Sequence, residues 1–210
     1  MKLPRIYPLT DVPLTGLSQV QQVRQLSLGG AALIQLREKQ MPARELYEQA
    51  KAAVAVVKQW GGQLLINDRV DIALAVGAHG VHLGQDDMPP EAARQLLGPD
   101  AVIGYSTHNM EQAIAATKLP IDYLAIGPIF ATTTKSDTAP IVGLEGLRAV
   151  RQEIGTFPLV AIGGITRENA REVIQAGADS VAGISALLSD PTAITKTTRL
   201  LLQDLLTLHD

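Results

Sequence analysis

Residues 159–184 read LVAIGGITRENAREVIQAGADSVAGI, and this stretch holds one complete structural unit. Leu159–Ile162 is expected to be a strand buried on both faces, because its four residues are all apolar. Thr166 is expected to N-cap a helix that ends at Gly177, and Ser180–Ile184 then forms the next strand. A strand, a helix and a second strand in this order predict two parallel strands joined by a crossover helix.

The same unit recurs along the whole chain, without a change in composition that would mark a linker. Short apolar runs predict eight strands, at Ile6–Thr10, Ala31–Leu36, Gln63–Ile66, Gly80–Leu83, Ala101–Tyr105, Asp122–Ile126, Leu159–Ile162 and Ser180–Ile184. Helical spacing predicts the helices, at Ser18–Leu28, Pro42–Trp60, Asp71–Val76, Pro90–Leu97, Met110–Thr117, Leu147–Ile154, 166–177 and from Asp190, with Pro191 as its first residue, to about Leu206.

Eight strand–helix units predict an α/β fold: one domain over residues 1–210, closed into a (β/α)8 TIM barrel. The alternative is an open doubly wound sheet. Its dinucleotide-binding motif, G-x-G-x-x-G, does not occur in the chain.

The composition excludes several classes of protein. Of the 210 residues 46% are hydrophobic, and 18 Lys and Arg stand against 21 Asp and Glu, so intrinsic disorder is excluded. The chain has no cysteine, which excludes disulfides and cysteine-based metal or nucleophile sites. A net charge of −3 and an aromatic content of 3% argue against a nucleic-acid partner.

Targeting signals are not expected either. Met1–Leu9 contains two prolines and lacks the apolar core of a signal peptide, and no stretch reaches the roughly 20 apolar residues of a membrane span. We therefore expect a cytoplasmic protein that does not bind membranes. A homo-oligomer is compatible with the sequence but is not indicated by it.

Chemistry in a barrel of this kind is expected at the carboxyl ends of the strands. At the end of the second strand, alternation places Gln35, Arg37 and Lys39 on one side. Two cations and an amide that point the same way suit a multiply charged anion. The alternative is a solvated, charged strand end.

Carboxylates follow the next two strands. Asp68 comes after the third, and Asp86 and Asp87 come after the fourth, so the side chains can converge across one opening. Two carboxylates beside a pyrophosphate are a usual way of holding Mg²⁺. The alternatives are that Asp68 N-caps a helix and that the other two are turn residues before Pro89.

The fifth strand ends in Ser106-Thr107-His108, any of which can cap the helix that follows. His108 is also a candidate general acid or base. His82, within the fourth strand, is expected to be a structural histidine with satisfied hydrogen bonds.

Three later loops suit phosphate groups. Thr132–Lys135 offers hydroxyls, amides and an ammonium, against the alternative of a flexible polar loop. Gly164 and Ser185 lie in the loops after the seventh and eighth strands, where barrels often bind a phosphate. The alternative for these glycine-rich loops is close strand–helix packing. Together the loops and the Arg37/Lys39 cluster suggest an enzyme that joins two phosphorylated small molecules.

Seven segments in this order resemble the thiamine-phosphate synthase (thiamine-phosphate pyrophosphorylase) family. They are QLREK at 35–39, NDR at 67–69, GVHLGQDD at 80–87, GYSTH at 104–108, GPIFATTTK at 127–135, AIGGI at 161–165 and GISAL at 183–187. The set spans about three quarters of the chain and covers seven of the eight strand ends, so it is far more specific than any single piece.

The resemblance implies a Mg²⁺-dependent transferase of class EC 2.5.1.3. Such an enzyme joins 4-amino-2-methyl-5-(diphosphomethyl)pyrimidine to 2-(2-carboxy-4-methylthiazol-5-yl)ethyl phosphate. The products are thiamine phosphate, diphosphate and CO2. The substitution is expected to be dissociative: diphosphate leaves first, and the thiazole nitrogen then attacks the methylene cation.

By position, the resemblance implies a pyrimidine diphosphate site at Gln35, Leu36, Arg37, Glu38, Lys39 and Asn67, with Ser106 and Lys135 on the diphosphate. It implies a thiazole phosphate site at Thr132, Thr133, Thr134, Gly164, Ile184 and Ser185, and Mg²⁺ at Asp68 and Asp87 but not at Asp86. The implied catalytic residues are Arg37, Lys39, Ser106 and Lys135. Two departures are small: Ala131 stands where many members have proline, and Gly183 where a larger apolar residue is usual.

Two other functions remain open on the sequence. A thiazole tautomerase on the same barrel would need a base, for which His108 is the candidate, but would need neither the Asp68/Asp87 pair nor the 132–135 loop. A phosphate-binding module without catalysis would bind ligands but release no diphosphate.

Overall fold

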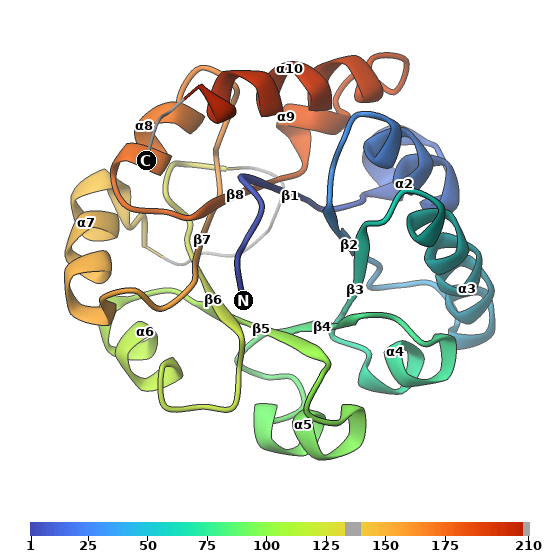
Figure 1. The fold of residues 1–210 in the computed structure, drawn as a ribbon, viewed down its shortest axis with the longest axis horizontal. Coiled ribbons are helices and arrows are strands. Elements are labelled where there is room, and N and C mark those ends of the chain that lie inside the picture. Colours follow the sequence, from blue (N-terminus) through green and yellow to red (C-terminus); the bar gives the residue numbers. More distant parts are fainter. Residues whose placement is uncertain (133–139, 208–210) are drawn as a thin grey trace.

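The computed structural model describes residues 1–132 and 140–207, and a parallel eight-stranded sheet forms its centre (Figure 1). The strands are β1 (Ile6–Pro8), β2 (Leu33–Leu36), β3 (Gln63–Asn67), β4 (Gly80–Leu83), β5 (Val102–Thr107), β6 (Tyr123–Ile126), β7 (Leu159–Ile162) and β8 (Ser180–Gly183). Hydrogen bonds link them in the order β1-β8-β7-β6-β5-β4-β3-β2. Just past β1, Leu9 forms a parallel bridge with Gln35, which joins β1 to β2 and brings the sheet round into a barrel. The predicted (β/α)8 fold is confirmed.

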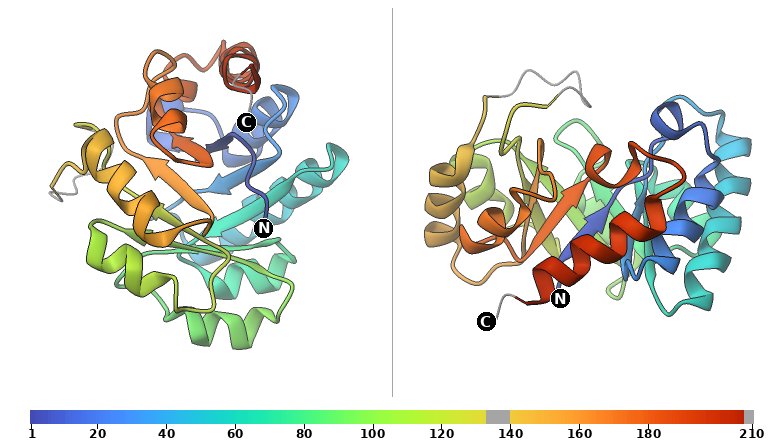
Figure 2. Two further views of the ribbon diagram at one scale, coloured as in Figure 1. Left: turned by 60° about the vertical axis from the view of Figure 1, so that its left-hand side comes forward. Right: turned by 90° about the horizontal axis from the view of Figure 1, so that it is seen from above.

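Helices cover the outside of this barrel (Figures 1 and 2). They are α1 (Val12–Thr15), α2 (Gln19–Leu28), α3 (Ala43–Gln59), α4 (Val70–Val76), α5 (Pro90–Leu97), α6 (Met110–Ala116), α7 (Gly143–Ile154), α8 (Ala170–Gln175), α9 (Ser185–Leu188) and α10 (Ile194–Leu206). The short helices α1 and α9 were not predicted, because four residues give too little periodicity to detect. No helix in the described ranges is long and apolar enough to cross a membrane.

Three predicted helix starts differ from the structure. The helix α7 begins at Gly143 and not at Leu147. The other two helices begin later than predicted, because a side chain holds a turn ahead of each. Asn169 accepts a hydrogen bond from the Thr166 amide (2.8 Å) and donates one to the Gly164 carbonyl (3.1 Å), so α8 begins after this turn. Asp190 accepts from both the amide and the hydroxyl of Thr192, so α10 begins after residue 193 and not at residue 191.

The strands are buried on both faces, as their apolar composition predicted. Every residue of β2, β4 and β6 is buried. Tyr7 and Tyr123 are the largest fully buried side chains of the described residues, at 1% and 0% exposure. The barrel interior therefore contains polar hydroxyl groups as well as aliphatic side chains.

Two arginine clamps of the same design fasten the amino ends of the strands. Arg94 and Arg151 each donate to carbonyl groups just beyond their own helix and to an aspartate 28 residues further along, Asp122 and Asp179. Each aspartate also accepts an amide from β5 or β7 respectively. These contacts stabilise the end of the barrel opposite to the carboxyl ends of the strands, where chemistry is expected.

Candidate active site

A cavity of about 710 Å³ opens at the carboxyl ends of the strands, and most of its polar lining comes from β2 to β5 and the segments after them. We call it the charged cavity. Its lining includes Gln35, Arg37, Lys39, Asn67, Asp68, His82, Asp87, Ser106 and His108. The polar strand ends that were predicted to share one opening are thus brought together.

Alternation along β2 and the residues after it is as predicted. Gln35, Arg37 and Lys39 line the charged cavity, whereas Leu36 between them is fully buried. The reason is the period of two in an extended chain, which sends every second side chain to the same side.

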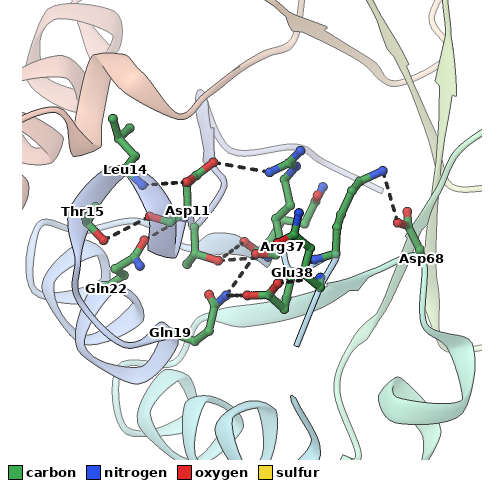
Figure 3. Close-up of polar contacts among 12 residues, drawn as sticks. Asp11, Leu14, Thr15, Gln19, Gln22, Arg37, Glu38 and Asp68 are labelled. Carbon is green, nitrogen blue, oxygen red and sulfur yellow. Dashed lines mark hydrogen bonds and ion pairs between the residues drawn. The ribbon is translucent and has the colours of Figure 1, made fainter. Parts of the chain in front are cut away.

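Glu38 has its carboxylate bound within its own loop (Figure 3). One oxygen accepts from the amides of Lys39, Gln40 and Met41, and the other accepts from Gln19 Nε2 at 3.3 Å. Burial tends to raise the pKa of Glu38, but these hydrogen bonds outweigh it and the pKa is lowered. The Glu38 carboxylate therefore shapes the loop that carries Lys39.

Arg37 is held by a residue that the sequence did not indicate. Asp11 Oδ2 lies 3.4 Å from Arg37 Nη1, while its other oxygen accepts from the Leu14 amide at 3.0 Å and caps α1 (Figure 3). The Thr10 hydroxyl accepts from the Arg37 amide at 2.9 Å. Asp11 precedes a Pro-containing helical turn, so a cap could have been found from sequence, but its contact with a residue 26 positions away could not.

Asp68 and Asp87 lie next to each other in the lining of the charged cavity. Asp68 has a φ of 60°, a conformation that few residues other than glycine adopt, and it does not cap α4, whose preceding residue is Arg69. Asp87 Oδ2 accepts from the Gly84 amide at 2.6 Å, and Lys39 Nζ lies 3.6 Å from Asp68 Oδ2 (Figure 3).

The environment of Asp68 disfavours its negative charge. Burial, a hydrogen bond with Asp87 and the charge of Asp87 raise the pKa of Asp68 to about 6, against the opposing effect of Lys39. Two carboxylates this close are a site that a cation would stabilise. Among the described residues no group of three or more acidic or histidine side chains could hold a metal. A pair of carboxylates alone fits Mg²⁺, which usually keeps water and takes further ligands from phosphate oxygens.

Ser106 lies at the edge of a buried polar cluster. Its hydroxyl is 2.8 Å from His82 Nε2, and His82 Nδ1 is 2.9 Å from the Tyr123 hydroxyl. His82 is 8% exposed, so its assignment as a structural histidine with satisfied nitrogens is confirmed. Tyr123 was not recognised as a neighbour of the site, because it enters from β6.

His108 lines the charged cavity with one ring nitrogen already engaged. Its Nδ1 lies 3.0 Å from the Gly127 carbonyl, to which it donates. The helix that follows, α6, is N-capped by Asn109, so none of Ser106, Thr107 and His108 has the capping role offered as their alternative.

A second cavity, which we call the glycine-lined cavity, adjoins the first. Its lining includes Gly127, Thr132, Gly163, Gly164, Gly183, Ile184 and Ser185, and it shares Ser106 and His108 with the charged cavity. Gly164 has a φ of 65°, and a Cβ there would lie 2.6 Å from the Ala131 carbonyl. The close packing given as the alternative role of this glycine is thus present. Thr133, Thr134 and Lys135 lie outside the described residues.

The fold and the cavities define a class of protein: a parallel (β/α)8 barrel with two joined cavities at the carboxyl ends of its strands. The profile of the family described as Thiamine monophosphate synthase matches residues 6–187. The chain is 50% identical to the thiamine-phosphate synthase of Koribacter versatilis, over 91% of this chain and 92% of the relative. It is 46% identical to that of Chloroflexus aurantiacus, over 94% and 92%.

Among solved structures, a thiamine phosphate pyrophosphorylase from Pyrococcus furiosus superposes with a TM-score of 0.87 at 40% identity, covering 96% of this chain and 95% of that one. The chain belongs to the thiamine monophosphate synthase family.

Proposed function

We propose that the two cavities are the active site of a thiamine-phosphate synthase, with the pyrimidine diphosphate in the charged cavity and the thiazole phosphate in the glycine-lined cavity. By its family and relatives the chain is such a synthase, a transferase of thiamine biosynthesis. The observation that carries the assignment of the cavities is their common wall: Ser106 and His108 line both. Ligands in the two cavities would therefore meet, as an enzyme that joins two substrates requires.

Electrostatics in the charged cavity suit departure of diphosphate. Arg37 and Lys39 carry fixed positive charge there, and Lys135 is expected from the sequence to add a third cation. Cations already in place stabilise the charge that grows on the leaving oxygen as the bond to the methylene carbon breaks. The aminopyrimidine stabilises the resulting methylene cation, and the thiazole nitrogen attacks it. Neither step requires a protein base. The thiazole carboxylate then leaves as CO2, and the ring carbon that keeps the bonding electrons takes up a proton.

Asp68 and Asp87 are the residues that would hold Mg²⁺. When bound, Mg²⁺ supplies charge neutralisation to the diphosphate. The contribution of the chain is to keep the two carboxylates together, with Asp87 fixed by the Gly84 amide. Lys39, beside Asp68, places an ammonium where the same anion would sit.

The glycine-lined cavity is suited to a monophosphate. Gly164, Ile184 and Ser185 bring backbone amides to its edge, and Asn169 holds the Gly164 carbonyl in place. Thr132 lines the same cavity, and the residues 133 and 134 are assigned to it from the sequence.

An assay with both substrates, with and without Mg²⁺, tests the proposal. Thiamine phosphate and diphosphate are expected in equal amounts and only with Mg²⁺. No product under any condition would contradict the synthase assignment. Isomerisation of the thiazole phosphate alone would instead support a tautomerase, and ligand binding without diphosphate release would support a binding module.

Other assignments stay predictions. Residues 1–210 are proposed to act as one catalytic domain, because strands from Ile6 to Gly183 share one sheet. A cytoplasmic location stays a prediction from the sequence.

A further inference from the structure

Five polar side chains form a continuous hydrogen-bond chain across the barrel interior, and all of them except Tyr123 also line the charged cavity. Gln35 Nε2 lies 2.9 Å from the Tyr7 hydroxyl, which lies 2.8 Å from the Tyr123 hydroxyl. His82 continues the chain, with Nδ1 2.9 Å from the Tyr123 hydroxyl and Nε2 2.8 Å from Ser106 Oγ. The end members, Gln35 and Ser106, both line the charged cavity.

The middle of this hydrogen-bond chain is buried and closely packed. Tyr7 is 1% exposed and Tyr123 is 0% exposed, and their rings meet edge to face with centroids 5.7 Å apart. The ring of His82 stacks on Tyr123 at 5.6 Å. Gly104 makes room for this arrangement, since a Cβ there would lie 2.0 Å from the Tyr123 ring. Burial raises the pKa of both tyrosines, so the hydroxyls stay neutral and act only through hydrogen bonds.

The protons of the chain can run in either of two directions. In the first, the Gln35 amide donates to Tyr7, which donates to Tyr123. Tyr123 then donates to Nδ1 of His82. His82 carries its proton on Nε2 and donates it to Ser106, whose own hydroxyl proton is left to point into the cavity.

In the opposite direction every bond reverses. Ser106 donates to His82, and the protons then run through the two tyrosines to the Gln35 side-chain oxygen, with the amide turned over. A mixed state, in which Gln35 and Tyr123 both donate to Tyr7, leaves the buried Tyr7 proton without an acceptor among the described residues. Such an orphaned donor costs about 1–3 kcal/mol, so the two complete directions dominate.

The direction of the chain links the hydrogen-bonding character of its two ends. When Ser106 is a donor to the cavity, Gln35 presents its oxygen, an acceptor. When Ser106 is an acceptor, Gln35 presents its amide hydrogens. Gln35 lines the charged cavity, and its side-chain oxygen is buried without a hydrogen-bond partner in the described part of the protein.

We propose that this chain of hydrogen bonds couples recognition of the amino group of the pyrimidine to recognition of its diphosphate. The inference rests on the proposed function. An amino group that donates to Gln35 selects the direction in which Ser106 donates, and a diphosphate oxygen accepts that proton. A pyrimidine with an oxo group in the same place selects the opposite direction, in which Ser106 has no proton to offer the diphosphate. Tyr7, Tyr123 and His82 are thus positioning residues that set specificity.

Binding measurements with separate ligands test this coupling. The probes are 4-amino-5-hydroxymethyl-2-methylpyrimidine, its 4-oxo analogue, and inorganic diphosphate with Mg²⁺. In the unaltered protein the aminopyrimidine should tighten diphosphate binding by about fivefold or more, a typical size for coupling between sites. The 4-oxo analogue should leave the diphosphate affinity unchanged or weaken it.

Tyr123→Phe removes one hydroxyl from the middle of the chain and keeps the ring. The coupling factor should fall to about one, while diphosphate alone still binds. Tyr47→Phe is the matched control, because the Tyr47 hydroxyl is not part of the hydrogen-bond chain. The variant keeps the ring, whose centroid lies 5.6 Å from the Lys51 ammonium. Tyr7→Phe interrupts the same chain and replaces Tyr123→Phe if that variant does not fold.

Full coupling in a folded Tyr123→Phe or Tyr7→Phe variant would overturn the proposal, as would equal coupling by the 4-oxo analogue. Failure of this inference alone is distinct from failure of the proposed function. In the first case the protein makes thiamine phosphate while the two ligands bind independently; in the second it makes none, and both proposals fall.

Discussion

Replacing Asp87 by asparagine should stabilise the metal-free protein while weakening its affinity for Mg²⁺. The pKa of Asp68 is about 6 in the folded protein and 3.8 ordinarily. The folded state therefore binds this proton more tightly than the unfolded state between these values. The free energy of unfolding therefore falls as the pH rises from about 3.8 to about 6. Above pH 6 the folded protein carries the full cost of holding Asp68 in its charged form.

A shift from 3.8 to about 6 corresponds to about 3 kcal/mol in total. Burial of Asp68, the largest cause, persists in the variant, and the side chain is 24% exposed, which further reduces the recoverable part. Asp87→Asn should therefore raise the free energy of unfolding by about 1–2 kcal/mol at pH 8 and by almost nothing at pH 4. The asparagine oxygen can still accept from the Gly84 amide, so the turn is kept.

Urea unfolding at pH 4 and pH 8 with a chelator present measures this difference. Asp86→Asn is the control, because Asp86 lines the same cavity but does not contribute to the shift at Asp68. Titration of each variant with Mg²⁺ should show weaker binding only for Asp87→Asn. Equal stabilisation by both variants, or no pH dependence, would refute the reasoning.

Three further predictions concern the glycine-lined cavity, the clamps and the 132–135 loop. Gly164→Ala should lower the free energy of unfolding by about 2–4 kcal/mol and raise the KM for the thiazole phosphate, because residue 164 has a positive φ and its Cβ would clash with the Ala131 carbonyl. Gly183→Ala is the control: its Cβ would meet nothing nearer than 3.9 Å, so denaturant unfolding should show unchanged stability. Arg151→Ala should lower the free energy of unfolding by about 2–4 kcal/mol and leave kcat unchanged, because it loses several hydrogen bonds far from the cavities. Arg167→Ala, which removes the exposed ion pair with Asp204, is the control and should have little effect. Similar losses of stability in the two variants would contradict the role of the clamp. Lys135→Ala should slow the single-turnover rate far more than it weakens thiazole phosphate binding, and an unchanged rate would remove the role given to this lysine.

Local patterns accounted for the fold and much of the site. Apolar runs and helical spacing predicted every strand to within a few residues, because each depends on neighbours along the chain. Period-two alternation placed Gln35, Arg37 and Lys39 on one side of an extended segment. The rule that barrels carry chemistry at the carboxyl ends of strands then brought Asp68 and Asp87 to the same opening.

Errors in the sequence analysis came where a side chain competes with a local rule. Thr166 has the residue type of an N-cap, but Asn169 folds back to hold the turn and delays the helix. Glu38 stays a predicted substrate-binding residue, and its carboxylate accepts hydrogen bonds from the amides of its own loop.

The sequence by itself determined the barrel and the strand ends that carry charge, because propensity and period are properties of short segments. Only the tertiary structure decided the partners of these groups. Asp11 meets Arg37 across 26 positions, and Tyr7 meets Tyr123 across 116. The first contact joins the segments after β1 and β2, and the second reaches from β1 to β6 across the barrel interior. Both depend on closure of the barrel, so no spacing along the chain could have indicated them.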